Sequence, residues 1–158
     1  MKQKYKFENI IIIAHSMGGL VSRSAINHLS KIKYPASIKL FVSISTPWGG
    51  HSAAAQGIKH APAVVPAWYD MAPDSPFIAS LYETPLPKGT DFYLIFSHKS
   101  RSGMSNLFKS GNNDGVVTLR SQLSLPAQKA AVKTYGLFED HVLILSSKTT
   151  SDTLNDFL

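Results

Sequence analysis

The residues best suited to chemistry lie in the stretch Ala14-His15-Ser16-Met17-Gly18-Gly19. This stretch stands between an apolar run typical of a buried strand and a segment with helical spacing. A sharp turn there projects the serine hydroxyl above the sheet, and the small residues let strand and helix approach closely. The Met17 amide then lies at the helix N-terminus, facing a developing oxyanion. We therefore predict Ser16 as a nucleophile and Met17 as an oxyanion donor; alternatively, Ser16 only caps the helix.

Four apolar runs predict strands, and the segments between them are long enough for crossover connections. The first run is followed by a helical stripe that Pro35 closes. Continuous apolar runs are typical of strands buried on both faces of a parallel sheet. The sequence therefore predicts an α/β fold with a mainly parallel sheet. The runs are Phe7 to Ala14, Ile38 to Ile44, Phe92 to Phe96 and Ala130 to Tyr135, and the stripe is Leu20, Val21, Ala25, Ile26 and Leu29.

The stretch around Ser16 resembles the nucleophile elbow of lipase-like α/β-hydrolases, with Ala14 in place of the first glycine of G-x-S-x-G. In that fold an acid and then a histidine follow the serine, each after a later strand. The segments around Asp114 and His141 are similar to the acid and base segments of that group. The resemblance therefore implies a catalytic set of Ser16, Asp114 and His141.

The residues themselves leave other roles open for the acid and the base. Asp114 precedes Gly115 and also fits a turn, and His141 also fits a surface position at a helix start. The rival acids are Asp140, which adjoins the histidine, and Asp70 and Asp74. Acyl transfer or thioester cleavage would use the same three catalytic residues.

The remaining histidines do not suggest a second centre. His15, the variable residue of the elbow, is expected to pack or to bind substrate. Neither an acid partner nor a zinc-binding spacing accompanies the others, and we predict no metal and no cofactor. These other histidines are His28, His51, His60 and His98.

A Pro-rich segment over residues 47–89 separates the second and third predicted strands. Within it the pattern predicts a helix from Pro76 to Glu83, with Ser75 as N-cap. We predict that the segment is a lid over an acyl site, with Trp48 and Trp68 as substrate-binding residues. The alternative is an irregular connection whose aromatic residues, Phe77 included, belong to the core.

Two parts of this region carry a further resemblance. Ser45-Thr46-Pro47-Trp48-Gly49-Gly50 resembles the Thr-Pro-x-x-Gly loop found beside the active site in many lipases. In combination with Met71 to Leu81, it is most similar to the branch containing glycosylphosphatidylinositol inositol-deacylases and related bacterial esterases. Lys99 to Gly115 is expected to form a loop.

The chain of 158 residues, 44% hydrophobic and 16% charged, fits a single domain. The resemblance reaches from the first predicted strand to a closing helix ending at Leu158, and it implies the C-terminal portion of a three-layer α/β-hydrolase fold. In the family, several strands precede the elbow strand, and a loop after one of them supplies the second oxyanion donor. We expect a longer chain or a partner to supply these strands.

The composition bears on nucleic-acid binding, membrane contact and cysteine chemistry. The net charge of +6 comes from scattered residues, with one dense cluster at Lys2, Lys4 and Lys6, so we expect no nucleic acid but allow contact with a membrane surface. The absence of cysteine excludes disulfides, thiolate metal sites and a cysteine nucleophile. The run Ile10 to Ile13 is too short for a signal peptide, and the compartment stays open.

These observations predict a serine hydrolase that cleaves lipid or other hydrophobic carboxylic esters through an acyl-enzyme. The alternative is a catalytically silent α/β-hydrolase module.

Overall fold

The computed structural model describes residues 8–32, 37–61, 63, 65–99 and 112–158. Four of its strands form one sheet in the order β1-β2-β3-β4, and every neighbouring pair is parallel. The strands are β1 (Asn9–His15), β2 (Ser37–Ile44), β3 (Asp91–Ser97) and β4 (Lys133–Leu137). The expected α/β class and parallel sheet are confirmed. Phe7, Pro35, the cluster Lys2, Lys4 and Lys6, and most of the Lys99 to Gly115 loop lie outside the described residues.

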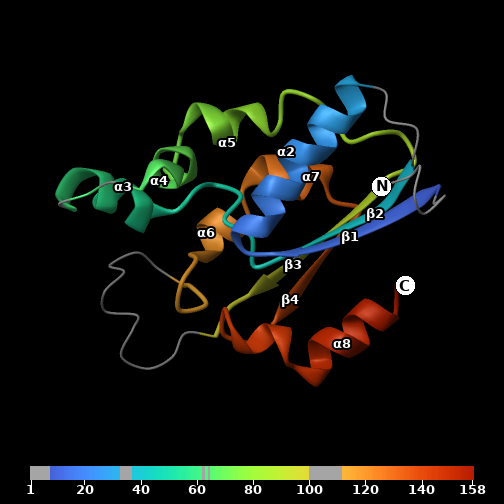
Figure 1. Ribbon diagram of the computed structural model, residues 1–158. Coiled ribbons are helices and arrows are strands. Elements are labelled where there is room, and N and C mark those ends of the chain that lie inside the picture. The colour runs from blue at the N-terminus through green and yellow to red at the C-terminus, as the bar shows by residue number, and fades with distance from the viewer. Residues whose placement is uncertain (1–7, 33–36, 62, 64, 100–111) are drawn as a thin grey trace.

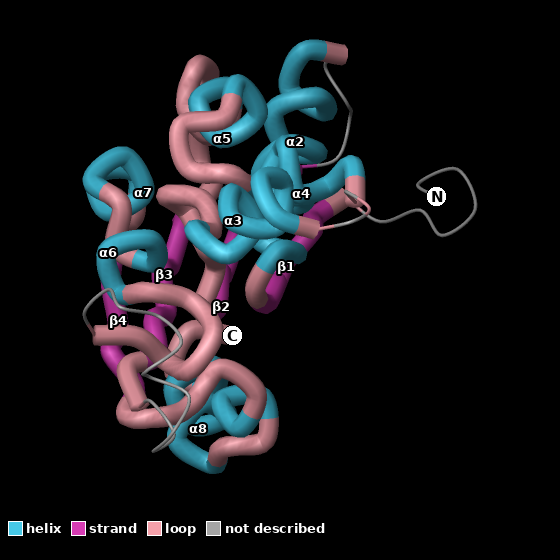
Figure 2. The backbone as a smooth tube through the Cα atoms, turned by 90° about the vertical axis from the view of Figure 1, so that its left-hand side faces the viewer, coloured by secondary structure: helices cyan, strands magenta, loops and turns pink. Residues whose placement is uncertain are grey.

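Helices cover both faces of the sheet and make three layers, which Figures 1 and 2 show from two directions. Helices α2 (Met17–Lys31), α5 (Pro76–Ser80) and α7 (Leu125–Ala130) lie over one face, and α8 (Lys148–Asn155) lies over the other. Each face has its own buried cluster, centred on Phe41 and Phe92 on the α2 side and on Val42 and Ile95 on the α8 side. None of the described helices is long and apolar enough to cross a bilayer.

The inward face of α2 differs from the predicted stripe. Leu20 and Ile26 are buried as expected, but Val21 is 57% exposed and Ala25 faces solvent. Arg23 and Asn27 occupy the buried positions instead. Their side chains donate to the carbonyl of Leu81 at 3.0 and 3.2 Å, so polar contacts tie α2 to the end of α5.

The described part of the segment over residues 47–89 contains three helices, of which the sequence predicted one. Helices α3 (Ser52–His60) and α4 (Pro66–Met71) lie beyond the carboxyl ends of the strands (Figure 1). Helix α5 begins as predicted, with the Ser75 hydroxyl accepting from the amide of Ile78 at 3.1 Å. It ends at Ser80 rather than Glu83. The carbonyl of Leu81 is already bonded to α2, and Pro85 disfavours helical backbone at the residue before it.

The last strand begins three residues later than predicted. Ala130 is the last residue of α7, which has Pro126 in its first turn, a position that proline tolerates well. Gly136 within β4 makes room for the ring of Phe96 on β3, since a Cβ atom there would lie 2.5 Å from that ring. The short helices α6 (Leu119–Gln122) and η1 (Leu143–Leu145) were not predicted, and the closing helix α8 ends at Asn155 rather than Leu158.

Candidate active site

Ser16 occupies a strained turn between β1 and α2. Its backbone has φ 54° and ψ −132°, a region that residues other than glycine rarely adopt. The turn is held by the Ser16 amide, which donates to the Ile44 carbonyl at 2.8 Å, and by the Gly19 amide, which donates to the Ser16 carbonyl at 3.0 Å. A Cβ at Gly19 would overlap the Thr46 side chain, so glycine lets α2 approach the end of β2. The Ser16 side chain makes no capping hydrogen bond, which contradicts a role as a helix cap alone.

The structure brings Ser16, His141 and Asp114 into one hydrogen-bonded chain. His141 Nε2 lies 2.9 Å from Ser16 Oγ, and His141 Nδ1 lies 2.7 Å from Asp114 Oδ2. An ionised carboxylate only accepts, so Nδ1 carries the proton and Nε2 is left to accept the serine proton. His141 is 6% exposed, so its position is fixed by protein contacts.

Asp114 is fully buried, and its carboxylate is surrounded by donors. Oδ1 accepts from the amides of Val116 at 3.0 Å and Val117 at 2.7 Å. Oδ2 accepts from Ser97 Oγ at 2.6 Å and Gln122 Nε2 at 3.1 Å, in addition to His141. Burial by itself raises the pKa of this carboxyl, but the hydrogen bonds from His141, Ser97 and Val117 outweigh it and hold the pKa below its ordinary value. The acid is therefore a charged acceptor at neutral pH.

Asp140, the rival acid, makes different contacts. Its Oδ1 accepts from the amides of Val142 at 3.0 Å and Leu143 at 2.8 Å, at the start of η1. These bonds shape the loop that carries His141. The imidazole itself is oriented by Asp114. Asp70 lies on α4 and Asp74 follows that helix, whereas the hydrogen bonds of the His141 ring go to Ser16 and Asp114.

His15 lies against the base. Its Nε2 is 2.8 Å from the carbonyl oxygen of His141, and the two rings are 4.7 Å apart between centroids. Burial and the neighbouring His141 lower the pKa of His15. The neutral ring donates to that carbonyl, and this contact braces the segment that holds the base.

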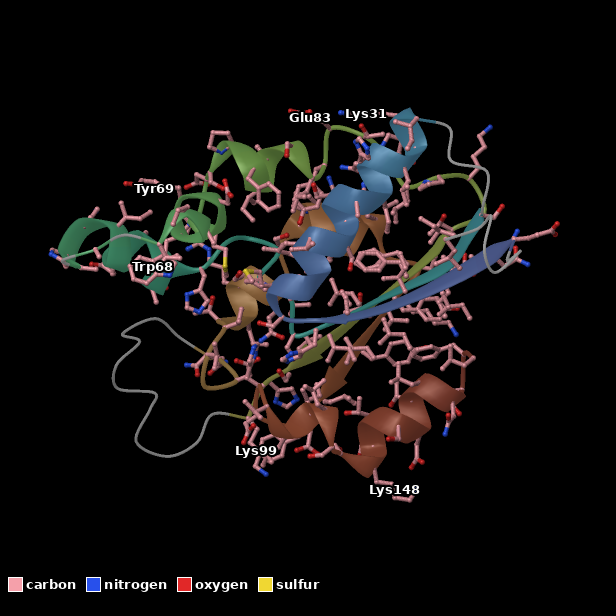
Figure 3. The ribbon with its side chains drawn as sticks, in the orientation of Figure 1. Lys31, Trp68, Tyr69, Glu83, Lys99 and Lys148 are labelled. Atoms are coloured by element: carbon pink, nitrogen blue, oxygen red, sulfur yellow. The ribbon has the colours of Figure 1, made fainter. Side chains whose placement is uncertain are left out.

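The two tryptophans expected to bind substrate have different surroundings. Trp48 is 2% exposed, packs edge-on against Phe41 and Phe92, and donates from Nε1 to Ser43 Oγ at 3.2 Å. This core position contradicts a substrate-binding role for Trp48. Trp68 is half-buried at the α3 and α4 end of the molecule (Figure 3), where its ring fills the space above Gly57. Phe77 packs against the core.

Met17 is the first residue of α2 and is 45% exposed beside the serine. Amides in the first turn of a helix have no intrahelical acceptor, so they are available to an external oxygen. A cavity of about 180 Å³ adjoins the base and acid. It lies between the acid segment and the base segment, and it is lined by Asp114, Gly115, Val116, Asp140, His141, Val142 and Leu143.

The segment after β2 is joined to the acid segment by several bonds. The Gly49 amide donates to the Ser121 carbonyl at 3.0 Å, and His51 Nε2 lies 2.8 Å from the carbonyl oxygen of Val116. The base of the 47–89 segment is thus fixed beside Asp114. In the part of the chain that the structure describes, no three His, Asp or Glu side chains are grouped so that they could hold a metal ion.

Sequence reasoning did not identify Ser97 and Gln122 as donors to the Asp114 carboxylate, or Ser45 as the neighbour whose Oγ lies 2.6 Å from Ser97 Oγ. Ser97 is the last residue of β3 and Ser45 directly follows β2, and both are fully buried. Small hydroxyl residues at the carboxyl ends of two predicted strands were the available signal, because such ends meet at one edge of a parallel sheet.

The chain is similar to a known family profile over part of its length and to several solved structures. The profile of the PGAP1-like alpha/beta domain matches residues 1–63. No curated protein sequence matches the chain significantly. The product of the lin2722 gene of Listeria innocua superposes with a TM-score of 0.67 at 15% identity, and the match covers 99% of this chain and 60% of that chain.

Two further solved structures are described as hydrolases of ester bonds by their names. The mature lipase BlEst2 of Bacillus licheniformis has a TM-score of 0.69 at 21% identity, covering 98% of this chain and 67% of that chain. A metagenomic carboxyl esterase has a TM-score of 0.55 at 18% identity, covering 90% of this chain and 50% of that chain. The chain thus spans between half and two thirds of the length of these structures. It has the α/β-hydrolase fold of these lipases and esterases, as the resemblance implied.

Proposed function

We propose that this protein is a serine hydrolase that cleaves carboxylic esters, with Ser16 as nucleophile, His141 as base and Asp114 as acid. The observation that carries the proposal is the continuous chain of hydrogen bonds, 2.9 Å from Ser16 Oγ to His141 Nε2 and 2.7 Å from His141 Nδ1 to Asp114 Oδ2. The strained backbone of Ser16 supports it, because strain of this kind concentrates at functional residues.

In the first half of the reaction, Ser16 Oγ attacks the ester carbonyl carbon while its proton passes to His141 Nε2. The carbonyl oxygen becomes an oxyanion, to which the Met17 amide donates. Asp114 stabilises the imidazolium through Nδ1. The intermediate then collapses, the bond to the alcohol oxygen breaks, and that oxygen takes the proton from His141, leaving an acyl-serine and a free alcohol.

In the second half, water attacks the acyl-serine and gives its proton to His141 Nε2. The second tetrahedral intermediate expels Ser16 Oγ, which recovers the proton, and a carboxylic acid leaves. Nothing but water is consumed besides the ester.

Hydrophobic esters, including those of lipids, are the substrate class that we propose. Val116, Val142 and Leu143 line the cavity beside His141, and all three side chains present apolar surface. We propose that the segment over residues 47–89, whose helices α3 and α4 lie beyond the carboxyl ends of the strands, forms a further wall of the substrate site (Figure 1). An apolar site of this kind favours a hydrocarbon chain over a charged peptide.

A second oxyanion donor belongs to the proposal. Since the match covers 60% of the Listeria structure, we propose that further polypeptide of the same fold pairs with β1 and brings this donor beside Ser16. Loss of one donor costs about 10² to 10³ in turnover. The alternative function is a catalytically silent binding module. This alternative follows if no further polypeptide supplies the second oxyanion donor.

The test is hydrolysis of a series of p-nitrophenyl esters with acyl chains of increasing length, measured for the chain and for Ser16→Ala. We expect turnover that rises with apolar chain length and falls by about 10⁶ in Ser16→Ala. Ser22→Ala, in the same helix, is the matched control and should keep wild-type turnover. A rate that Ser16→Ala does not lower would overturn the proposal.

A further inference from the structure

Ser45 has a backbone conformation that normally selects glycine. It directly follows β2, is fully buried, and has φ 50°. A left-handed conformation is strained for a residue with a Cβ, and glycine avoids that strain. The Ser45 amide donates to the Ile95 carbonyl at 2.9 Å, which holds the residue at the boundary between β2 and β3. Because glycine would fit this backbone without strain, we infer that the serine is present for the hydrogen bond of its hydroxyl.

That hydroxyl begins a chain of bonds that ends on the acid. Ser45 Oγ lies 2.6 Å from Ser97 Oγ, and Ser97 Oγ lies 2.6 Å from Asp114 Oδ2. Because the carboxylate only accepts, the single proton of Ser97 points at Asp114. Ser45 must therefore donate to Ser97, and the two hydroxyls point in one direction toward the charge.

Gln122 fixes the middle of this chain. Its Oε1 accepts from the Ser97 amide at 2.9 Å, and its Nε2 donates to the Ser97 carbonyl at 3.0 Å. The same Nε2 lies 3.1 Å from Asp114 Oδ2. The side-chain amide of Gln122, itself 1% exposed, thus holds Ser97 and the carboxylate in one arrangement.

We propose that Ser45 is a positioning residue whose hydroxyl, acting through Ser97, fixes the Asp114 carboxylate and so orients His141. This inference rests on the proposed function and assigns the strained Ser45 a purpose within it. Ser45 touches no reacting atom. A chain of aligned hydroxyls polarises each next bond, so losing the first donor weakens the second as well.

The decisive variant is Ser45→Gly, since glycine accepts φ 50° without strain and removes only the hydroxyl side chain. We expect kcat to fall at least about tenfold, because small displacements of catalytic groups are costly. We also expect the acidic limb of the pH profile of kcat/KM to move to higher pH. With fewer donors on its oxygens, the Asp114 carboxylate interacts more strongly with the imidazolium at Nδ1.

A second variant and a matched control separate this role from packing. Ser97→Ala breaks the chain one bond nearer the acid, and the double variant with Ser45→Gly should lose no more than Ser97→Ala alone. Ser43→Ala removes a buried hydroxyl within β2, two residues before Ser45, and this hydroxyl accepts a hydrogen bond from Trp48 instead. Ser43→Ala should lower the stability of the fold and leave the acidic limb of the pH profile of kcat/KM unchanged.

Proton NMR of the His141 Nδ1 hydrogen, assigned by its absence in His141→Gln, reads the same geometry without turnover. We expect this far-downfield signal to shift in Ser45→Gly and in Ser97→Ala but not in Ser43→Ala. A chain that hydrolyses no ester yet shows the shift would fail the proposed function and keep the positioning role. An unchanged signal in both variants, with circular dichroism showing folded protein, would overturn the positioning role whatever the activity.

Discussion

The two outer strands of the sheet present very different surfaces to solvent. Strand β4 has five residues, and its exposed positions carry Lys133, Thr134 and Gly136. Strand β1 has seven residues, and Ile11 and Ile13 are 52% and 44% exposed. Short edge strands with charged and polar side chains resist pairing with other strands, whereas long apolar ones invite it. Strand β4 has the chemistry of a sheet edge, and β1 has that of an interior strand.

The same contrast divides the candidate site. His141 and Asp114 follow β4 and β3, where each polar atom of the carboxylate has partners. Ser16 directly follows β1, the strand that carries the exposed isoleucines. Residues of this chain thus supply the hydrogen bonds that hold the acid and the base. The strand beside the nucleophile, in contrast, has an exposed apolar surface.

We expect the largest loss of activity from a change at the acid, Asp114. Asp114→Asn should lower kcat by about 10⁴, because an asparagine in that position stabilises the wrong tautomer of His141. Steady-state kinetics on a p-nitrophenyl ester measures the loss. Asp140→Asn is the control, since its bonds go to loop amides, and it should keep activity within about tenfold. Equal losses in the two variants would mean that the acid has been wrongly assigned.

Next in size is a stability difference between two residues that face each other in the register of β1 and β2. Ile13 pairs with Val42, which is fully buried. Val42→Ala should lower the free energy of unfolding by about 2 kcal/mol, and Ile13→Ala by less than about 1 kcal/mol. Urea titration of both variants provides the measurement. A larger cost at Ile13 would show that β1 is covered in solution.

A smaller effect should appear in self-association. Ile11→Lys combined with Ile13→Lys should reduce concentration-dependent association in light scattering, because charge on an edge strand blocks pairing. Val132→Lys, at a 58% exposed apolar residue just before β4, is the matched control and should change little. If both changes act alike, general solubility rather than the β1 edge controls association.

The smallest effect concerns pH and His15, the last residue of β1, which contacts the base segment. Its pKa lies below the ordinary 6.5, so the unfolded chain binds a proton that the folded chain excludes. Stability contributed by neutral His15 is therefore present above that value and is lost as pH falls through it. His15→Asn should remove this part of the pH dependence in urea titrations at several pH values. Asp114 acts with the same sign at lower pH, so its contribution should persist in the variant.

Local patterns were enough to predict the strands and the turn at Ser16. The apolar runs, the small residues beside Ser16 and the change to helical spacing all lie within a few neighbouring positions. The start of α5 could also be predicted from the sequence, since Ser75 and Pro76 form a local capping signal. Its end was not, because Arg23 and Asn27 from another helix take the carbonyl of Leu81.

Features set by distant contacts could not be predicted in this way. Arg23 looks like a solvent-facing residue until the acceptors on the chain after α5 are known. Trp48 looks like a binding residue, but β2 and β3 enclose it with Phe41 and Phe92. Ser97 and Gln122 are ordinary polar residues in sequence, and only the fold brings both to Asp114.

Whether Ser16, His141 and Asp114 form an assembled catalytic set is tested most directly by intact-mass analysis of the folded chain after treatment with a fluorophosphonate probe. The probe forms a covalent bond to a serine whose proton a neighbouring base accepts, so it reports an assembled nucleophile without any assumption about substrate. We expect one adduct per chain, absent in Ser16→Ala and retained in Ser22→Ala. A folded chain that takes no adduct, or an adduct that survives Ser16→Ala, would contradict it.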